Sequence, residues 1–371
     1  MTSPLPPGST IGILGGGQLG RMSALAAARL GYRCHVYAPE AESPGMQVAA
    51  AATIAPYEDE AALARFAAAV DVVTFEFENV PAGTLAALAP LAPCRPGVEV
   101  LRVCQDRLAE KAFLERAGVP VAPWRAVEDE AGLATALQEI GLPAVLKTTR
   151  LGYDGRGQSV IRHPDEAAAA FARLEPKPLI LEAFVPFVAE VSAIAARGGD
   201  GASTVYDAVE NRHRDHILDL SFAPARLPVA DAARGHALRV ADALGLVGVL
   251  ALELFVLPDG RLLGNEIAPR PHNSGHWTMD GCAASQFEQH VRAVAGLPLA
   301  TATRHHDVVM KNLVGPDGLA RWPSLLRQPD VVPHWYGKAE ARPGRKLGHA
   351  NKLLPIGSLS TLDDDAALQG L

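Results

Sequence analysis

The chain lacks most features that mark secreted or membrane proteins. Its four cysteines, Cys34, Cys94, Cys104 and Cys282, form no C-x-x-C pair, so we expect reduced and mostly buried thiols. The first eight residues are proline-rich and uncharged, and so lack the basic start of a secretory signal. No apolar run approaches the roughly 20 residues that a membrane-spanning helix needs.

Positive charge is also scarce. The 34 Lys and Arg residues oppose 41 Asp and Glu residues, which leaves a net charge of -7. This balance argues against a general polyanion binder, so important basic groups must act locally. With 49% apolar residues among 371, the chain can bury a full core in two or three domains. We expect a cytoplasmic protein that binds neither nucleic acid nor membrane.

Strand and helix alternate through the first hundred residues. The expected strands cover residues 11–14, 33–37 and 70–76, and the expected helices cover 19–30 and 58–69. This alternation predicts a parallel sheet with crossover helices. A single helix is expected over 98–117, because Gly118 and Pro120 would end it.

Two mixed units follow. The first, over 123–182, has a strand that ends at Lys147, further strands at 159–161 and 179–182, and a helix at 165–174. The second, over 190–296, has helices at 229–244 and 283–295. From about Thr303 we expect only short strands and turns.

The most informative pattern is a pair of glutamates placed symmetrically about Asp259-Gly260. Apolar runs flank this dipeptide, which is the strongest short-range signal for a two-residue hairpin turn of type I′. That turn would place Glu253 directly opposite Glu266, with Cβ atoms about 4.5–5.5 Å apart. Two such carboxylates repel unless a cation lies between them, which predicts a Mg²⁺ site. An ion pair of one glutamate with Arg270 is the structural alternative.

Two glycine-rich segments predict phosphate-binding loops. Residues 15–20 (GGGQLG) follow an expected strand and open a helix, as an anion-binding loop requires. Glu40 lies where a dinucleotide site has its ribose-binding acid, so a NAD-dependent dehydrogenase is an alternative, although Arg21 favours a phosphate. Residues 152–158 (GYDGRGQ) lie between expected strands, as in a flap over phosphates, and Lys147 could reach an α-phosphate. Either loop could instead be a purely structural turn.

Polar residues gather directly after the hairpin. In residues 269–277 (PRPHNSGHW), Arg270 could neutralise charge on a transferring phosphoryl group, and Asn273 and Ser274 could hold a polar substrate. We assign no chemical role to the two histidines of this segment. Residues 342–349 (RPGRKLGH) place three cations around a turn, which could clamp a second phosphate or be solvated. Glu76, at the end of an expected strand, could hold a ribose or an amine.

Together these segments resemble the ATP-grasp superfamily, and most closely its N5-carboxyaminoimidazole ribonucleotide synthetases of purine biosynthesis. The match runs in order through GGGQLGR, EFEN, DRLAEK, GYDGRGQ, LELF…NEIAPRPHNSGHW and WY…RPGRKLGH. The HNSGHW and RPGRK elements are the specific ones. The formate-using glycinamide ribonucleotide enzymes are similar through PRPH and differ after it, and they are an alternative.

The resemblance implies an α/β and α+β fold of ATP-grasp architecture. We expect an N-terminal Rossmann-like domain with a parallel sheet over 1–106, a linker helix and lid domain over 107–188, a mixed-sheet catalytic domain over 189–302, and a small β-rich C-terminal domain over 303–371. The tail over 361–371 is shorter than family members usually carry.

The implied activity is an ATP-dependent carboxylation of 5-aminoimidazole ribonucleotide by bicarbonate, by way of carboxyphosphate. The products would be N5-carboxyaminoimidazole ribonucleotide, ADP and phosphate. ATP and Mg²⁺ are the implied cofactors, and relatives suggest a homodimer.

The resemblance also implies residue roles. Mg²⁺ would be held by Glu253 and Glu266. The residues that would contact ATP are Arg107, Lys147, Gly152, Tyr153, Asp154, Gly155, Arg156, Gly157, Gln158, Glu182, Ala183, Phe184, Val185, Glu190, His213, Asn265 and Glu266. The ribonucleotide would lie among Gln18, Leu19, Glu76, Tyr153, Arg156, Arg345 and Lys346, and the catalytic residues would be Asp154, Arg270, Asn273, Ser274 and Lys346. Asn265 and Glu266 can both touch nucleotide only if their strand bulges or ends there.

Overall fold

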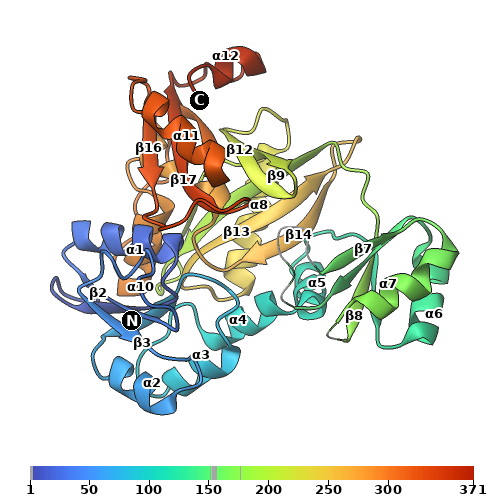
Figure 1. The fold of residues 1–371 in the computed structure, drawn as a ribbon, viewed down its shortest axis with the longest axis horizontal. Coiled ribbons are helices and arrows are strands. Elements are labelled where there is room, and N and C mark those ends of the chain that lie inside the picture. The colour runs from blue at the N-terminus through green and yellow to red at the C-terminus, as the bar shows by residue number, and fades with distance from the viewer. Residues whose placement is uncertain (1–2, 151, 153–156, 176) are drawn as a thin grey trace.

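The described part of the chain folds around three β-sheets. The computed structural model describes residues 3–150, 152, 157–175 and 177–371. A nine-stranded sheet lies in the middle of the molecule, between a four-stranded parallel sheet and a separate four-stranded antiparallel sheet (Figure 1). No helix in the described ranges is long and apolar enough to cross a membrane.

The N-terminal sheet is parallel, in the order β3-β2-β1-β4, as the alternation of strand and helix predicts. The side chains of its inner strands are almost entirely buried between helices on the two faces. Its elements are β1 (Thr10–Leu14), α1 (Gln18–Arg29), β2 (Arg33–Ala38), β3 (Ala51–Ile54), α2 (Glu60–Ala67), β4 (Val72–Phe75) and α3 (Ala82–Leu88).

The single helix expected over 98–117 is wrong, because the chain forms α4 (Val98–Gln105) and α5 (Arg107–Arg116). Asp106 between them has an extended backbone, and its carboxylate accepts hydrogen bonds from the amides of Leu108 at 3.0 Å and Ala109 at 3.2 Å. An aspartate in this position caps a new helix. The break therefore starts α5 at Arg107, and α5 packs against the hairpin strand β14.

The smaller antiparallel sheet, which we call the lid sheet, has the order β5-β8-β6-β7. As predicted, β6 and β7 flank the glycine-rich flap, and the Thr148 amide donates to the Gly157 carbonyl at 2.8 Å. The elements are β5 (Trp124–Val127), α6 (Glu130–Ile140), β6 (Ala144–Thr148), β7 (Gln158–Ile161), a 3₁₀ turn (Pro164–Glu166), α7 (Ala167–Arg173) and β8 (Leu179–Ala183).

The nine-stranded sheet has the order β14-β13-β9-β11-β12-β15-β17-β16, with β10 beside β9. The expectation of only short strands and turns after Thr303 is wrong, because β15 and β17 have eight and nine residues and continue this sheet. The strands are β9 (Ala189–Arg197), β10 (Ser203–Val205), β11 (Val209–Arg214), β12 (Ile217–Ala223), β13 (Gly248–Val256), β14 (Leu262–Ala268), β15 (Asp307–Val314), β16 (Val331–Trp335) and β17 (Lys346–Leu354).

Helices cover this sheet and complete the chain. The predicted helices near 229–244 and 283–295 correspond to α8 and α10. The elements are α8 (Ala230–Ala243), a 3₁₀ turn (Asn273–Gly275), α9 (Thr278–Gly281), α10 (Gln286–Ala295), α11 (Gly315–Leu325) and α12 (Asp364–Leu368). Alternate β13 side chains, including Leu252 and Leu254, face the largest hydrophobic core with α8. Strand alternation therefore puts Glu253 on the opposite face.

The hairpin turn differs from the predicted type I′ turn. The Leu257 amide donates to the Arg261 carbonyl and the Gly260 amide donates to the Leu257 carbonyl, both at 2.9 Å. The loop therefore has three residues and ends in Gly260 with a positive φ of 83°. This shifts the pairing near the turn by one residue from the predicted register.

A β-bulge at Asn265 then corrects the shift. Leu254 pairs with Gly264, but the next pair is Glu253 with Glu266, so Asn265 is an extra residue on β14. The predicted opposition of Glu253 and Glu266 is confirmed. A bulge was also predicted, as the condition for both Asn265 and Glu266 to contact a nucleotide, and it is present. The three-residue loop and the bulge together give this opposition.

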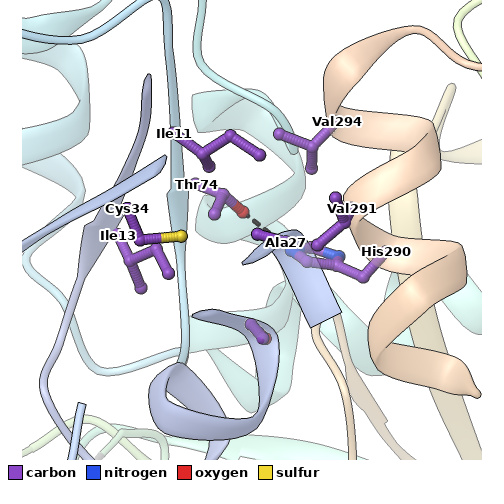
Figure 2. Close-up of a pocket in the computed structure, with 9 residues that line it drawn as sticks. Ile11, Ile13, Ala27, Cys34, Thr74, His290, Val291 and Val294 are labelled. Atoms are coloured by element: carbon purple, nitrogen blue, oxygen red, sulfur yellow. Dashed lines mark hydrogen bonds between the residues drawn. The ribbon is translucent and has the colours of Figure 1, made fainter. Parts of the chain in front are cut away.

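Helix α10 joins the N-terminal sheet to the nine-stranded sheet. His290 on α10 is buried, and its Nε2 lies 2.8 Å from Thr74 Oγ1 on β4. Figure 2 shows these side chains beside a cavity of about 10 Å³ with mostly apolar walls. Burial lowers the pKa of His290 to about 4. The small volume indicates a packing site, with room for one water molecule at most.

Candidate active site

The two opposed glutamates carry an excess of negative charge. Glu253 Oε1 lies 3.4 Å from His272 Nε2, and Glu266 Oε2 lies 3.7 Å from Arg107 Nη1. Burial, together with the neighbouring Glu266 carboxylate, raises the pKa of Glu253 to about 8. Such a pair offers hard oxygen ligands to a divalent cation. The described residues contain no group of three or more His, Cys, Asp or Glu placed to hold a metal, so phosphate or water would complete the coordination.

Arg270 does not pair with either of these glutamates. Its guanidinium forms an ion pair with Glu78, and its Nη1 donates to the Pro271 carbonyl at 3.1 Å. The alternative of a structural ion pair with Arg270 is therefore wrong, because the arginine that pairs with Glu266 is Arg107. Arg270 lies close enough to Glu266 for the two charges to interact.

Glu182 anchors two lysines at the end of β8. Its Oε2 lies 3.0 Å from Lys147 Nζ and 3.5 Å from Lys111 Nζ. Burial alone would raise the pKa of Glu182, but the two lysines outweigh it and hold the pKa at about 2. Lys147 and Glu182 are predicted site residues, whereas Lys111 was missed. Its spacing of four residues from Arg107 on α5 could have indicated it, because i and i+4 share a helix face.

Glu190 and His213 lie on the neighbouring strands β9 and β11 and form an ion pair. Burial opposes protonation of the ring, but the Glu190 carboxylate outweighs it and raises the pKa of His213. The structure therefore brings together these two residues predicted to contact nucleotide, on β9, which pairs with β13, and on β11, which pairs with β9.

A buried chain of hydrogen bonds ends at Glu253. Asn211 Nδ2 donates to Ser192 Oγ at 2.9 Å, and Ser192 Oγ donates to Ser274 Oγ at 2.7 Å. Ser274 Oγ lies 2.9 Å from His272 Nδ1, and the ring's other nitrogen faces Glu253. Ser274 was predicted to hold substrate, and its fully buried hydroxyl is bonded to Ser192 and His272.

This chain assigns the tautomer of His272. The Ser274 amide also donates to Nδ1, at 3.4 Å, so Nδ1 is an acceptor. Burial, with the nearby charges of Arg270 and Lys346, lowers the pKa of His272 well below its usual value. The neutral ring therefore carries its proton on Nε2, directed at Glu253. The residue pattern gave no reason to assign His272 this position, because its partners lie on distant strands.

Asn273 differs from its neighbour Ser274. Its side-chain oxygen and nitrogen are both buried, and neither has a hydrogen-bond partner among the described residues. Buried polar groups are rarely left unpaired in folded proteins. An unpaired amide beside the carboxylate site fits the predicted contact of Asn273 with a polar substrate.

The first glycine-rich loop holds an internal anion. The Glu76 carboxylate accepts hydrogen bonds from the amides of Gly17 and Gly20, the second at 2.7 Å. The prediction that these loop amides bind a ligand phosphate or dinucleotide is therefore wrong for these two groups. Gln18 and Leu19 lie between them, at the start of α1.

Cations gather near Glu76, and the charge of Lys338 interacts with its carboxylate. Arg345 directly precedes β17 and Lys346 is its first residue, and Lys338 lies close enough to both for their charges to interact with it. Burial, together with Arg345 and Lys346, lowers the pKa of Lys338 to about 8. Lys338 was not predicted, although only Gly337 separates it from the W-Y pair of the resemblance.

The flap is described only at its ends. Gly152 accepts a hydrogen bond from Arg107 Nη2 at 3.3 Å, and Gly157 has a positive φ of 70° at the start of β7. Gln158 is exposed. The predicted flap residues Tyr153, Asp154, Gly155 and Arg156 lie outside the described residues.

A pocket of about 410 Å³ lies between the end of β8 and the hairpin loop. This volume is within the usual range for small-molecule sites. The predicted nucleotide residues Ala183, Phe184 and Val185 line one side, and Leu257, Pro258 and Leu263 line another.

Three family models match successive parts of the chain. The ribonucleotide synthetase preATP-grasp domain matches residues 9–105, and the ATP-grasp domain matches 112–287. The phosphoribosylaminoimidazole carboxylase C-terminal domain matches 308–355.

Curated relatives match nearly the whole chain. The N5-carboxyaminoimidazole ribonucleotide synthase of Brucella melitensis is 52% identical over 355 residues, which cover 95% of this chain and 98% of that protein. The Bacillus subtilis synthase is 44% identical and covers 92% of this chain and 91% of its own length.

Solved structures agree with these relatives. The synthetase from Thermus thermophilus is 43% identical, with a TM-score of 0.88 and 97% of each chain covered. The synthase from Aspergillus clavatus, in complex with ADP and 5-aminoimidazole ribonucleotide, is 31% identical, with a TM-score of 0.90 and 98% and 97% covered. The chain therefore belongs to the N5-carboxyaminoimidazole ribonucleotide synthase family of ATP-grasp enzymes.

Proposed function

We infer that the chain is the ATP-dependent carbon-nitrogen ligase that carboxylates 5-aminoimidazole ribonucleotide with bicarbonate in purine biosynthesis. The observation that carries this inference is the opposed pair Glu253 and Glu266, linked through Lys111 to the Lys147–Glu182 pair, in a chain of this family. The relatives' names argue against the formate-using alternative. The internal anion at Gly17 and Gly20 argues against a dehydrogenase.

ATP would lie between the lid sheet and the β13–β14 hairpin. We propose that Ala183, Phe184 and Val185 border the base, and that Glu190 binds the ribose. Arg107 and Lys147 would contact the phosphates, together with the glycine flap. Mg²⁺, when held by Glu253 and Glu266, supplies positive charge to the phosphate oxygens. The opposed carboxylates, with a raised pKa at Glu253, support this assignment.

A bicarbonate oxygen attacks the γ-phosphorus, the bond to ADP breaks, and carboxyphosphate forms. The exocyclic amine of the ribonucleotide then attacks the carboxyl carbon, and phosphate leaves. We propose that Arg270, held by Glu78, stabilises charge on the transferring group, and that Asn273 binds the acceptor through its unpaired amide. Asp154 stays a prediction at this centre.

The ribonucleotide phosphate would bind between the start of α1 and the cations before β17. We propose contacts with Gln18 and Leu19 and with Arg345, Lys346 and Lys338. Glu76 occupies two amides of the glycine loop, so we propose that it holds this loop in place for the ligand. A homodimer and a cytoplasmic location stay predictions, and sedimentation of the purified chain tests the first.

A product assay with labelled bicarbonate tests the reaction. We expect label in an acid-labile carbamate of the ribonucleotide, and ATP hydrolysis that requires the ribonucleotide, bicarbonate and Mg²⁺ together. Hydrolysis that is indifferent to bicarbonate would contradict the assignment.

Substitutions of two arginines in the turn before β17 test the proposed ribonucleotide site. Arg345→Ala should weaken ribonucleotide binding about tenfold or more and change ATP binding little, because a phosphate loses a charged donor. Arg342, whose side chain is 70% exposed, supplies the control, and Arg342→Ala should change neither affinity. Equal losses for both ligands in Arg345→Ala would argue against this site.

A further inference from the structure

Strand β14 is the edge of the nine-stranded sheet, so one row of its backbone groups has no neighbouring strand. The bulge adds to this problem, because Asn265 has no partner on β13. An edge strand with a bulge is the weakest place to fix a register. Glu266 nevertheless has to lie opposite Glu253 for the two carboxylates to bind one cation.

Helix α5 supplies partners for the backbone of this edge, where the Gly264 amide also donates to the Pro120 carbonyl at 2.7 Å. Lys111 Nζ donates to the Asn265 carbonyl at 2.8 Å and to the Gly264 carbonyl at 3.3 Å. Glu110, the residue before Lys111, accepts a hydrogen bond from the Ile267 amide at 2.6 Å. Two consecutive side chains therefore hold the backbone on both sides of Glu266.

Both side chains are deeply buried, with 1% of Lys111 and 3% of Glu110 exposed. Burying a lysine is costly unless its charge is paired. Lys111 meets this requirement through Glu182 on β8, which lies 3.5 Å away and also binds Lys147. The Lys111 ammonium group thus contacts both the bulge of β14 and Glu182 of the lid sheet.

We propose that Glu110 and Lys111 are positioning residues that hold β14 in its bulged register and so keep Glu266 opposite Glu253. The inference rests on the proposed Mg²⁺ site at these carboxylates. Neither residue touches substrate in this arrangement, and both act through the backbone of residues 264–267. Loss of either side chain should lower the affinity for the metal ion without unfolding the chain.

Lys111→Met tests the proposal, because methionine keeps the length of the side chain and removes its donors. Lys352→Met is a matched control: Lys352 is 5% exposed and donates to two carbonyls, those of Ala366 at 3.1 Å and Gln369 at 2.7 Å, at the end of α12. The readout is Mn²⁺ binding to the full chain in the presence of ADP, measured by electron paramagnetic resonance, with hydrogen exchange over 262–268 as a second measurement.

We expect Lys111→Met to weaken Mn²⁺ binding about tenfold or more, as loss of an outer partner of a metal ligand typically does, and to speed exchange over 262–268. Lys352→Met should lower thermal stability and leave Mn²⁺ affinity within about twofold of the unmodified chain. Equal loss of Mn²⁺ affinity in both variants, or no loss in either, would overturn the proposal.

A second pair of variants applies if Lys111→Met does not fold. Glu110→Gln keeps an oxygen acceptor for the Ile267 amide, whereas Glu110→Leu removes it. We expect Glu110→Leu to bind Mn²⁺ about tenfold more weakly than Glu110→Gln. Equal affinities would show that the Ile267 contact does not position the site.

Glu266→Gln separates this proposal from the proposed function. If this variant binds Mn²⁺ as tightly as the unmodified chain, the metal assignment itself is wrong. If Glu266→Gln loses Mn²⁺ and Lys111→Met does not, the metal site stands and the positioning role is wrong.

Discussion

Three glutamates of the site, Glu182, Glu253 and Glu110, have carboxyl groups with very different pKa values. Burial alone raises the pKa of a carboxyl group. At Glu182 two lysines reverse this effect and hold the pKa at about 2, whereas at Glu253 and Glu110 the neighbouring Glu266 adds to it and the pKa reaches about 8. Glu182 therefore already has the cations that stabilise its charge, whereas the negative charge of Glu266 acts against ionisation of Glu253 and Glu110.

Glu266→Gln should therefore abolish Mg²⁺-dependent turnover without unfolding the chain. The amide keeps the size of the side chain but removes a charged ligand, so the loss of metal affinity should exceed the roughly 10–100-fold that removal of an outer partner causes. Turnover measured against Mg²⁺ concentration checks this result. An unfolded variant whose residual active fraction keeps its Mg²⁺ dependence would instead favour a structural ion pair.

At the scale of the element, the hairpin shows what sequence patterns can and cannot predict. The Asp259-Gly260 pattern located the hairpin and the two carboxylates, because turn residues and apolar runs are local features. The three-residue loop and the bulge at Asn265 each shift the register by one residue, and the shifts cancel. The contacts of Lys111 could not be predicted, because they join an edge strand to a helix about 150 residues earlier in the chain.

The same limit applies to the other missed elements and residues. The cap at Asp106 looks like a helix interior when only apolar spacing is considered, so one helix was expected where two form. His272 lies in a predicted functional segment, but its role depends on Ser192 and Asn211 on other strands. By contrast, the parallel N-terminal sheet and the strands around the flap follow from local patterns and are confirmed.

Gly260→Ala tests whether strain in the turn affects the opposed carboxylates. Alanine at a φ of 83° should cost about 1–2 kcal/mol of stability, because its Cβ crowds the backbone there. The bulge is unchanged, so Mn²⁺ affinity should stay the same. Thermal unfolding and Mn²⁺ titration measure the two effects. A large loss of Mn²⁺ affinity would show that the turn controls the opposition of the carboxylates.

Ser192→Ala should destabilise the centre of the nine-stranded sheet. The fully buried hydroxyl bonds both Asn211 and Ser274, and its removal leaves polar atoms unpaired in the interior. We expect a loss of about 1–3 kcal/mol in the free energy of unfolding. Urea unfolding measures it, and a change below about 0.5 kcal/mol would argue that this chain of hydrogen bonds contributes little.

At the scale of the whole molecule, several histidines are buried where the modules join. His276 and His349 pack against each other between the segment after the hairpin and β17, with ring centroids 4.7 Å apart. His290 joins α10 to the N-terminal sheet. Burial lowers the pKa of all three. Each must stay neutral in the folded chain, although it becomes protonated below about pH 6.5 in the unfolded chain.

His290→Gln should therefore become relatively more favourable as the pH falls. A folded pKa of about 4 lies below the unfolded value, so the unfolded chain binds the extra proton and stability is lost between about pH 6.5 and pH 4. The difference in unfolding free energy between variant and unmodified chain should shift by about 1.4 kcal/mol per pH unit in favour of the variant. Urea unfolding at several pH values measures it, with exposed His216→Gln as the control. A difference that does not change with pH would contradict it.

The continuity of the nine-stranded sheet has a mechanical consequence. Lys346 at the start of β17 and Glu253 on β13 belong to the same hydrogen-bonded sheet. The strands β15, β12, β11 and β9 connect them. The distance between the proposed metal site and the proposed site of the ribonucleotide phosphate would therefore be fixed by one continuous sheet. The lid sheet is a separate sheet, so a movement of it that enclosed the proposed nucleotide site would leave the distance between the other two proposed sites unchanged.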